Sequence, residues 1–370
     1  MKLVVFGLTI TSSWGNGHAT LWRGLQRALA GRGWQVVFFE RDTSYYAQHR
    51  DLRDLPCGEI VLYTEWREIE STARRHIGEA DAAIITSYCP DGLAATELVL
   101  SAPTAVRVFY DLDTPVTLAC LRRGEATSYI GPRGLGEFDL VLSFTGGGAL
   151  DGLSEMAAAR GPVPVYGHVD PEAYRPPASE EAHGRADLSY IGTYAPDRQE
   201  KLQRFFVIPA RERSERRFVL AGAQYPQDFP WTDNIFFLRH LPPAQHPLFY
   251  AASRLTLNVT RADMAAMGWC PSGRLFEAAA CGAAIISDWW TGLDHFFEPG
   301  REILLAQTSL DIMAALDLPE AQLRRIGENA RRRVLAEHTS MQRAAQLEDL
   351  LAKSRGSARE VRGAALGAEA

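Results

Sequence analysis

Apolar and polar positions follow two periods along the chain, and these periods predict strands and helices in turn. The first forty residues start with the apolar run LVVFGLTI, pass through a glycine-containing loop into TLWRGLQRALAGRG, and return to the apolar run QVVFFE. Leu21, Leu25 and Leu29 fall on one face of the middle segment, and two glycines follow it. The pattern is typical of a βαβ unit.

The same alternation continues and predicts two α/β domains. The runs DAAIITSY, TAVRVFYD and DLVLSF complete a first domain over residues 1–166, and a Pro-, Ala- and Glu-rich stretch over 167–186 is expected to be a hinge. DLSYIGT, RFVLAGA, NIFFLRH, RLTLNVT and AAIISDW belong to a second domain over 187–352, which ends in an Arg-rich helical region. Strands that are apolar throughout indicate parallel sheets covered on both faces. Residues 353–370 are expected to form a mobile tail.

Composition narrows the class of protein. The chain has 370 residues, 46% of them hydrophobic, and a net charge of -6. These values exclude disordered and fibrous classes and give no basic surface for nucleic acid. No apolar run is long enough to span a membrane, and the start of the chain predicts a buried strand rather than a signal peptide. Five scattered cysteines without a C-x-x-C pair favour neither disulfides nor a metal site, so we expect a cytoplasmic protein.

Candidate chemistry lies in loops that follow the predicted strands. Open parallel sheets bind ligands at the carboxyl ends of their strands, so an active cleft is expected between the two domains. In the first domain, the loop TSSWGNGHAT carries Gly15, Gly17 and His18 at the start of a helix. The glycines would let backbone N–H groups approach an anion. His18 is either a base or substrate contact, or an imidazole bonded to nearby backbone.

The same loop admits a dinucleotide interpretation. Glu40 ends the second strand, where a ribose-binding acid of an NAD site would lie. The fit is imperfect, because Thr20 replaces the third glycine and four residues separate the strand from Gly15. An NAD-dependent Rossmann oxidoreductase is therefore kept as an alternative.

Two further strand ends in the first domain carry candidates. In VRVFYDLDTP, Asp111 and Asp113 could orient sugar hydroxyls or serve as a base, or Asp113 or Thr114 could cap the next helix. In SFTGGGAL, Gly147 allows either close approach of a ligand or a tight turn.

The second domain has a denser set of candidates for binding phosphate. IGTYAPDRQEKL places Gly192 and Thr193 at a strand end and Arg198 one turn further on, which suits a phosphate-binding edge or a solvated helix. In PSGRLFEAAACG, a helix opens with Ser272 and Gly273. Its free N–H groups could hold a diphosphate.

The same helix carries two charged candidates. Arg274 would add positive charge to the diphosphate site. Glu277, one turn inside, could chelate both hydroxyls of a ribose, or could pair with Arg274 on an exposed face. Its apolar neighbours favour burial, and a buried carboxylate needs partners.

PSGRLFEAAACGAAIISDWWTGLDHFFEPGREILL resembles the donor-binding fingerprint of GT-B glycosyltransferases, in particular the spore-coat CgeB-like branch related to the family-4 retaining enzymes. VYGHVDPEAYRP is similar to the hinge segment G-V-D-x-x-x-F-x-P of those enzymes. The resemblance covers most of residues 160–345, and the first half matches more loosely.

The resemblance implies a fold and a function. The fold would be two Rossmann-like parallel-sheet domains that face an interdomain cleft, with a C-terminal helix packing back toward the N-terminal domain. The activity would be transfer of a sugar from a nucleotide sugar, with UDP- or GDP-sugar expected, to a hydroxyl acceptor such as a glycan, a small molecule or a protein. The second domain would bind the donor and the first the acceptor. No cofactor and no metal are implied, and polysaccharide biosynthesis is the expected setting.

Residue roles follow from the same resemblance. Glu277 would bind the ribose, Ser272, Gly273 and Arg274 would cradle the diphosphate, and Gly192, Thr193 and Arg198 would form its opposite edge, while His240 would hold the base through its backbone. Family-4 enzymes often have a second acid eight residues before the ribose-binding one, but Trp269 stands there. Donor sugar and stereochemistry are therefore left open, with His18 or Asp111 as the base of an inverting path.

Other functions are compatible with the same motifs. A non-catalytic nucleotide-sugar-binding protein would keep Glu277 without transferring a sugar, and a sugar-nucleotide epimerase could share the architecture. The Arg-rich stretch around Arg324 and Arg331 could reach anionic lipid, which would make the protein peripheral to a membrane, but interspersed acids favour an ordinary solvated helix. The sequence defines no oligomeric state.

Overall fold

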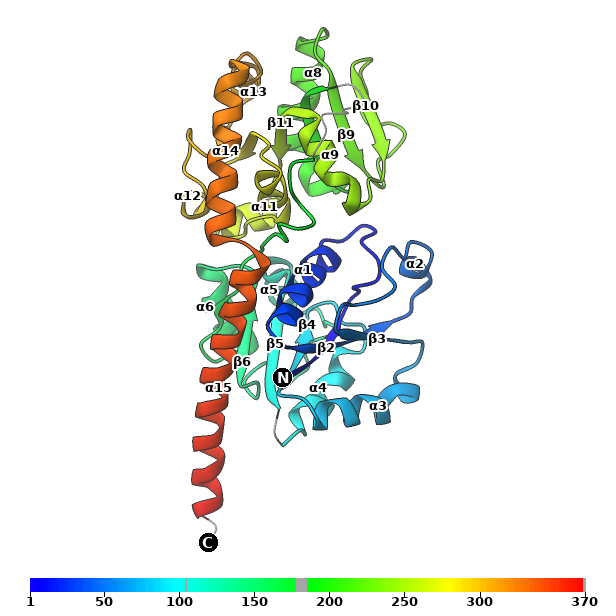
Figure 1. Ribbon diagram of the computed structural model, residues 1–370, viewed down its shortest axis with the longest axis vertical. Helices are drawn as coiled ribbons and strands as arrows, with labels where there is room; N and C mark the ends of the chain where they lie inside the picture. Colours follow the sequence, from blue (N-terminus) through cyan, green and yellow to red (C-terminus); the bar gives the residue numbers. More distant parts are fainter. Residues whose placement is uncertain (104, 178–184, 369–370) are drawn as a thin grey trace. The chain divides into compact units, whose positions relative to one another are not determined.

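The chain forms two compact units in a computed structural model that describes residues 1–103, 105–177 and 185–368 (Figure 1). The first unit runs from Met1 to Tyr166 and takes up the chain again from Ser340, and the second runs from Gly167 to Thr339. The described part of the expected hinge thus belongs to the second unit, and residues 178–184 of that hinge lie outside the described residues.

A parallel sheet forms the centre of the first unit. Its seven strands have the order β3-β2-β1-β4-β5-β6-β7. Neighbouring strands pair in register, for example Leu3 with Val36 and Phe109 with Val141. The chain reverses its direction of winding between β1 and β4, which is where such sheets bind ligands. The strands are β1 (Lys2–Gly7), β2 (Gln35–Arg41), β3 (Gly58–Tyr63), β4 (Ala82–Thr86), β5 (Val106–Asp111), β6 (Leu140–Ser143) and β7 (Val163–Pro164).

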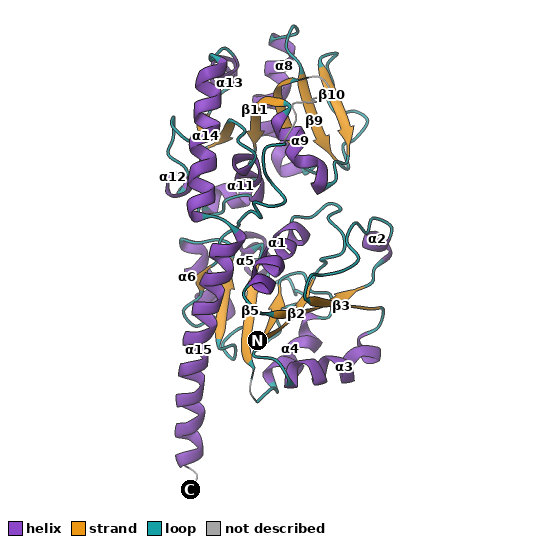
Figure 2. Cartoon of the chain, viewed as in Figure 1, coloured by secondary structure: helices purple, strands orange, loops and turns teal. Residues whose placement is uncertain are grey.

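Helices cover both faces of this sheet (Figure 2). Trp22 of α1 and Leu347 of α15 belong to one buried core with Leu3 and Val5 of β1. On the other face, Phe6 contacts Trp66 of α3. The helices are α1 (His18–Gly31), α2 (Ser44–Ala47), α3 (Trp66–Gly78), α4 (Gly92–Leu100), α5 (Thr114–Arg122), α6 (Gly148–Ala157) and α15 (Ser340–Ala368).

The last helix packs on the N-terminal unit, as the resemblance implied, but it differs from the predicted domain boundary. Residues 340–352 were expected in the second domain, but α15 packs along α1 because Ala344, Leu347 and Leu351 complete the core of the first unit. The predicted tail at 353–370 is also helical as far as Ala368. Its Ala and Arg residues favour a helix, although the stretch also contains Gly356, Gly363 and Gly367.

The second unit is also built on a parallel sheet. Its six strands have the order β10-β9-β8-β11-β12-β13, with the reversal between β8 and β11. The prediction of two parallel α/β domains of the Rossmann type is confirmed. The strands are β8 (Ala186–Ile191), β9 (Phe218–Gly222), β10 (Ile235–Arg239), β11 (Ser253–Asn258), β12 (Ile285–Asp288) and β13 (Leu304–Ala306).

Short helical segments and two longer helices surround this second sheet. α14 contacts α11, and it can approach closely because Gly327 faces the Gly282 carbonyl oxygen, where a Cβ would lie only 2.2 Å away. The segments are η1 (Pro196–Arg198), α7 (Gln199–Leu202), η2 (Gln203–Val207), α8 (Ile208–Glu212), η3 (Pro243–Gln245), α9 (His246–Ala251), α10 (Ala262–Met267), α11 (Gly273–Ala280), α12 (Leu293–Phe296), α13 (Ser309–Leu316) and α14 (Glu320–Glu337). Within the described ranges, no helix is both long and apolar enough to cross a membrane.

Candidate functional site

The strand ends of the second unit bring its predicted phosphate-binding residues together. Gly192 and Thr193 follow β8, Gly222 ends β9, and Arg198 closes η1 after the β8 loop. All these strands are parallel, so their carboxyl ends share one edge of the sheet. Arg274, near the start of α11, reaches the same edge, because its Nη1 donates to the carbonyl oxygen of Ile191 at the end of β8.

Gly192 has a physical reason for being a glycine. A Cβ at this position would lie 2.6 Å from Nη1 of Arg274 and 2.7 Å from the Tyr190 hydroxyl. Gly222 is equally restricted, since a Cβ there would lie 2.0 Å from the Gly192 carbonyl oxygen. Both glycines thus allow the Arg274 guanidinium and two strand ends to occupy the same small volume.

Arg198 lies in this volume with hydrogen-bonding capacity left over. Its side chain is buried, with 7% exposure for the residue, and its Nη2 donates to the Thr193 carbonyl oxygen at 2.5 Å. Its Nε is buried and has no hydrogen-bond partner among the described residues. Burial lowers the pKa of Arg198, and the positive charge of nearby Arg274 lowers it further. Two guanidinium groups that share a buried site favour an anion between them.

The start of α11 adds donors to this positive site. Ser272 is the N-cap residue, but its side chain does not cap the helix; its Oγ instead accepts from Nε of Arg274 at 3.3 Å. Gly273 follows, and a Cβ there would meet nothing within 4 Å. The first N–H groups of a helix carry partial positive charge. The sequence-predicted residues Ser272, Gly273 and Arg274 therefore lie in one positively charged corner with Arg198.

Glu277 lies one turn further along α11 and is buried, with 8% exposure. Its Oε2 lies 3.7 Å from Nδ1 of His246, at the start of α9. The Tyr174 hydroxyl is a second neighbour of this carboxylate. The alternative in which Glu277 lies on an exposed helix face is wrong, because the helix face that carries it is packed inward. His246 was not among the predicted site residues, because nothing in the run HPLFYAAS marks its histidine as a neighbour of an acid.

His240 and Trp269 adopt left-handed backbone conformations, with φ of 59° and 49°. The N–H of His240 donates to the Gly222 carbonyl oxygen at 2.9 Å, which ties the end of β10 to the end of β9. The N–H of Trp269 donates to the Thr291 carbonyl oxygen at 2.7 Å. The role of His240 in holding a base stays a prediction.

In the first unit, the structure pairs two predicted residues that lie 95 positions apart. Nε2 of His18, the first residue of α1, lies 2.8 Å from Oδ2 of Asp113. A carboxylate can only accept, so Nε2 carries the proton, and in the neutral imidazole Nδ1 holds the basic lone pair. Nδ1 makes no hydrogen bond within the described part of the chain. Asp113 is the N-cap residue of α5, yet its side chain does not cap that helix.

Asp111 ends β5, two residues before Asp113, and is fully buried. Its Oδ1 accepts from the Asp113 N–H and from the Thr117 hydroxyl, both at 3.1 Å. Its Oδ2 is buried without a hydrogen-bond partner in the residues described. Burial raises the pKa of Asp111 to about 7, with a further contribution from the charge of Asp113. Asp111 therefore exchanges a proton near neutral pH, directly beside the His18–Asp113 pair.

Three predicted glycines of the first unit have different local roles. Gly15 has a φ of 69° and lies close to the Tyr45 hydroxyl, which a Cβ would approach to 2.9 Å. Gly17 is the N-cap residue of α1. Gly147, the N-cap residue of α6, has φ 56° and ψ −140°, a conformation essentially restricted to glycine. The tight-turn interpretation of Gly147 therefore has a direct structural basis.

The acceptor positions of the Glu40 carboxylate are filled by donors of the protein itself. Its carboxylate accepts four hydrogen bonds, from the hydroxyls of Thr9 and Thr11 and from the N–H groups of Ile10 and Thr11. A carboxylate has about four acceptor positions, so none is left for a ribose. The loop folds back onto β2 instead of forming the tight turn of a dinucleotide site. The structure is thus against the NAD alternative based on Gly15, Gly17 and Glu40.

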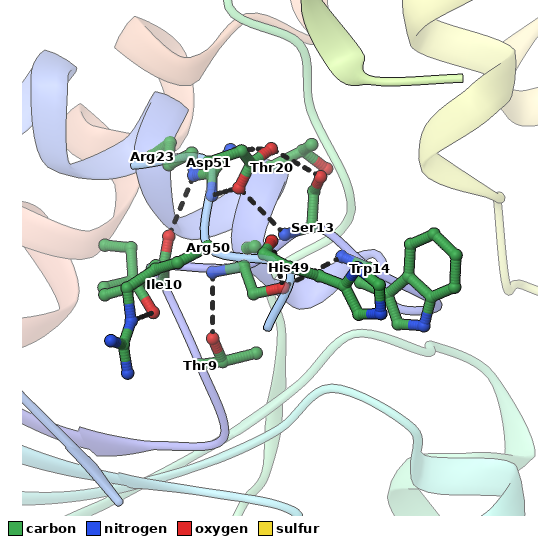
Figure 3. A network of polar contacts seen from close by, with 12 residues as sticks. Thr9, Ile10, Ser13, Trp14, Thr20, Arg23, His49, Arg50 and Asp51 are labelled. Carbon is green, nitrogen blue, oxygen red and sulfur yellow. Dashed lines mark hydrogen bonds and ion pairs between the residues drawn. The ribbon is translucent and has the colours of Figure 1, made fainter. Parts of the chain in front are cut away.

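More polar contacts fix the rest of this loop (Figure 3). Arg23 donates to the Ile10 carbonyl oxygen at 2.9 Å and to both oxygens of Asp51. Ser13 donates to the same carboxylate through its hydroxyl at 2.6 Å. Trp14 stacks on His49, with ring centroids 3.8 Å apart. These contacts fix the conformation of the loop and thereby the position of His18, which follows it.

Clusters that could hold a metal ion were also sought. Within residues 1–103, 105–177 and 185–368, no group of three or more His, Cys, Asp and Glu side chains is arranged in this way.

Comparisons with known proteins identify the class of fold. Residues 198–349 match the family model described as "Glycosyl transferase-like". The chain is similar in structure to sucrose-phosphate synthase from Thermosynechococcus elongatus, with 15% identity, a TM-score of 0.67, and coverage of 96% of this chain and 99% of that one. No curated protein sequence matches the chain.

Two further structural relatives extend the comparison. Anabaena HepE in complex with UDP and glucose has 14% identity and a TM-score of 0.66, over 95% of this chain and 100% of that one. An alpha-glucosyltransferase in complex with UDP and a 13-mer DNA has 13% identity and a TM-score of 0.69, over 95% and 99%. At these identities the likeness shows the fold alone. The fold is GT-B, and the glycosyl transferase-like segment comprises most of the second unit.

Proposed function

We propose that this protein is a glycosyltransferase that moves a sugar from a nucleoside diphosphate sugar to a hydroxyl acceptor. The observation that carries the proposal is the approach of buried Arg198, from η1, to partly buried Arg274, near the start of α11, next to the buried acid Glu277. Two guanidinium groups and a helix N-terminus suit a diphosphate, and a carboxylate one turn away suits the adjoining ribose. This arrangement lies in the segment that matches the glycosyl transferase-like family.

The donor is proposed to be a UDP- or GDP-sugar. Gly192 and Thr193 would form the other edge of the diphosphate site, and the backbone of His240 would contact the base. The choice of uridine is supported by the similar structures, one of which is a complex with UDP and glucose and the other a complex with UDP and DNA. Transfer of a hexose and membership of the CgeB-like branch are the corresponding finer proposals, and both rest on the sequence motifs of the second unit.

Charge stabilisation drives the proposed reaction. The acceptor oxygen attacks the anomeric carbon while the bond from that carbon to the phosphate oxygen breaks, and the nucleoside diphosphate leaves with the bonding electrons. Arg198, Arg274 and the first N–H groups of α11 would stabilise the negative charge that develops on this leaving group. These groups supply positive charge from the chain itself, so we propose that the reaction needs no added metal or cofactor.

His18 is the proposed base. Asp113 holds Nε2–H, so the imidazole presents Nδ1 as the nitrogen that receives the proton of the acceptor hydroxyl. A base that acts on the face opposite the leaving group gives inversion at the anomeric carbon. Asp111 is the alternative base because it titrates near neutral pH. Gly15, Gly17 and Gly147 would lie in the loops of this acceptor-binding unit, in a protein expected to act in the cytoplasm.

A nucleotide-binding panel tests the donor half of this proposal. The melting temperature of the protein would be measured with UDP, GDP, ADP, CMP, dTDP and NAD, for the native chain, for Glu277→Ala and for the exposed control Glu298→Ala. A ligand at about 100 times its Kd adds roughly 2.7 kcal/mol of stability. We expect one nucleoside diphosphate to raise the melting temperature of the native chain and the control, and to lose most of its effect with Glu277→Ala.

Other outcomes separate the alternatives. A shift with NAD alone would overturn the proposal. Binding of a nucleoside diphosphate without transfer or hydrolysis of the matching nucleotide sugar, followed by mass spectrometry, would favour the non-catalytic alternative. Conversion of the sugar while it stays attached to the nucleotide would indicate an epimerase.

A further inference from the structure

Glu277 is surrounded by side chains that the sequence motifs do not connect with it. Tyr174, with 6% exposure, comes from the turn that follows Asp170, and Tyr250, with 1% exposure, comes from α9 together with His246. All of them belong to the second unit. The hydroxyl of Tyr174 lies 3.5 Å from Nδ1 of His246, which itself lies 3.7 Å from Oε2 of Glu277.

The protons of this cluster can be assigned from the chemistry of each partner. Nε2 of His246 lies 3.1 Å from the Leu241 carbonyl oxygen. A carbonyl oxygen only accepts, so Nε2 carries a proton. The Glu277 carboxylate also only accepts, so His246 can hold it only when Nδ1 carries a proton as well. Nδ1–H then donates toward Glu277 or the Tyr174 hydroxyl, and that hydroxyl keeps its own proton for the carboxylate.

Tyr174 differs from the hinge pattern by one hydroxyl group. It occupies the aromatic position of the hinge pattern G-V-D-x-x-x-F-x-P, where the pattern has Phe. A phenylalanine would give the same ring packing without a hydroxyl. Burial raises the pKa of Tyr174, and the negative charge of Glu277 raises it further, so the phenol keeps its proton and stays a donor. The hydroxyl is thus an addition to the packing role, and it lies beside the His246 ring that contacts the acid.

We propose that Tyr174 and His246 are positioning residues that hold the Glu277 carboxylate in the orientation in which it accepts both hydroxyls of the donor ribose. The inference rests on the proposed function, because it takes Glu277 as the ribose-binding acid. A carboxylate fixed by neighbours loses little freedom when the ribose binds, so it discriminates well between a ribose and a 2′-deoxyribose. Tyr174 and His246 thereby set the sugar specificity of the nucleotide site.

Two conservative variants remove the contacts and keep the packing. Tyr174→Phe deletes only the hydroxyl. His246→Gln places an amide near the position of Nε2, so it can still donate to Leu241, but it has no atom at the position of Nδ1. Tyr250→Phe is the matched control, since it deletes an equally buried hydroxyl from the same helix as His246, and that hydroxyl has no hydrogen-bond partner among the described residues.

The readout is the ratio of two dissociation constants measured by calorimetry, for UDP and for 2′-deoxy-UDP. GDP and 2′-deoxy-GDP replace them if the panel identifies GDP. We expect the native chain and Tyr250→Phe to bind the ribonucleotide at least tenfold more tightly. Tyr174→Phe and His246→Gln should bind the ribonucleotide about five- to tenfold more weakly and the deoxynucleotide unchanged, so their ratio falls toward one.

Each other result contradicts the inference in an identifiable way. If both nucleotides weaken equally in the two variants, Tyr174 and His246 support the fold and do not orient Glu277. If the ratio stays at its native value in both variants while Glu277→Ala abolishes it, the inference fails and the proposed function stands. If the native chain binds no nucleoside diphosphate, both fail together.

Discussion

The loop after β1 and the edge after β8 look alike in sequence and use their polar groups in opposite ways. Each follows the first strand of its sheet along the chain and contains glycines, and each has a helix start beside it. In the first loop, the Glu40 carboxylate uses all its acceptor positions for hydrogen bonds from N–H and hydroxyl groups of the same loop. At the second edge, Arg198 keeps a buried Nε without a partner in the described chain.

This difference separates a structural network from a binding site. A buried polar group that the protein satisfies stabilises a conformation, and one that it leaves unsatisfied costs free energy until a ligand arrives. The difference agrees with the proposed anion site in the second unit and with a structural role for the glycine-containing loop that precedes His18. Nδ1 of His18 and Oδ2 of Asp111 are likewise buried without a hydrogen-bond partner among the described residues.

The largest expected effect concerns turnover. His18→Ala should lower the rate of sugar transfer by about 10²- to 10⁴-fold, because the acceptor hydroxyl loses its base. Asp113→Asn should cost less, about 10- to 100-fold, since it only disturbs the orientation of the ring. Nucleotide affinity, measured by calorimetry, should stay within twofold in both variants and in the exposed control His295→Ala. A rate for His18→Ala within threefold of native would remove His18 from the mechanism.

Nucleotide affinity should respond to the second unit instead. Arg198→Ala removes the buried one of the two guanidinium groups, so the nucleoside diphosphate should bind about 30- to 1000-fold more weakly, which corresponds to about 2–4 kcal/mol. The control is Arg204→Ala. Arg204 is an exposed arginine that pairs with Glu200, one helical turn before it. Equal affinities in the two variants, measured by calorimetry, would show that Arg198 does not face the diphosphate.

Glu40 tests the structural side of the comparison. Glu40→Ala leaves buried N–H and hydroxyl groups without an acceptor, so the free energy of unfolding should fall by about 3–5 kcal/mol in urea titrations. Nucleotide affinity of the folded variant should not change. The exposed control Glu59→Ala should alter stability by less than about 1 kcal/mol. If Glu40→Ala left stability intact but weakened nucleotide binding, the loop would be a ligand site after all.

The smallest expected effect is a pH dependence of stability at Asp111. Burial raises its pKa to about 7, so between about pH 4 and pH 7 the folded protein holds a proton that the unfolded chain releases. This group therefore makes the native chain less stable as the pH rises through that window, and the loss is complete above pH 7. Asp111→Asn cannot titrate and escapes the loss.

Melting temperatures of both chains at pH 5 and pH 8 measure this effect. The melting temperature of Asp111→Asn minus that of the native chain should be larger at pH 8 than at pH 5. The increase should be about 2–4 °C for each kcal/mol of stability that the native chain loses, in a domain of this size. A difference that does not change with pH would mean that Asp111 is ionised in the folded protein throughout the range.

Much of the fold could be predicted from the sequence, because parallel strands buried on both faces leave long apolar runs. The strand β3 was not predicted, since it lies at the edge of its sheet and only one of its residues, Tyr63, is buried. The boundary at 352 was wrong, because the apolar face of a helix does not by itself identify the sheet that it packs on. The resemblance, by contrast, correctly implied that the C-terminal helix returns to the first domain.

The candidate site was predicted only in part, and distance along the chain is the reason. Arg274 and Glu277 lie in one recognisable helix, so their pattern is local. The pairing of His18 with Asp113 and the contact of Glu277 with Tyr174 and His246 depend on which loops the topology brings together, and no local pattern encodes that. Glu40 had the right position for a ribose acid, but spacing alone could not reveal that the loop after β1 folds back onto it.

The return of the chain into the first unit at Ser340 has a consequence for synthesis. The second unit is one continuous stretch, Gly167–Thr339, inserted into a first unit whose core needs Ala344, Leu347 and Leu351. On the ribosome, the domain that starts first therefore finishes last, since its core stays open until the final helix emerges. A chain truncated before Ser340 would lack α15, so the apolar core residues beside α1 would be exposed. The inserted unit, by contrast, has all its strands before that point.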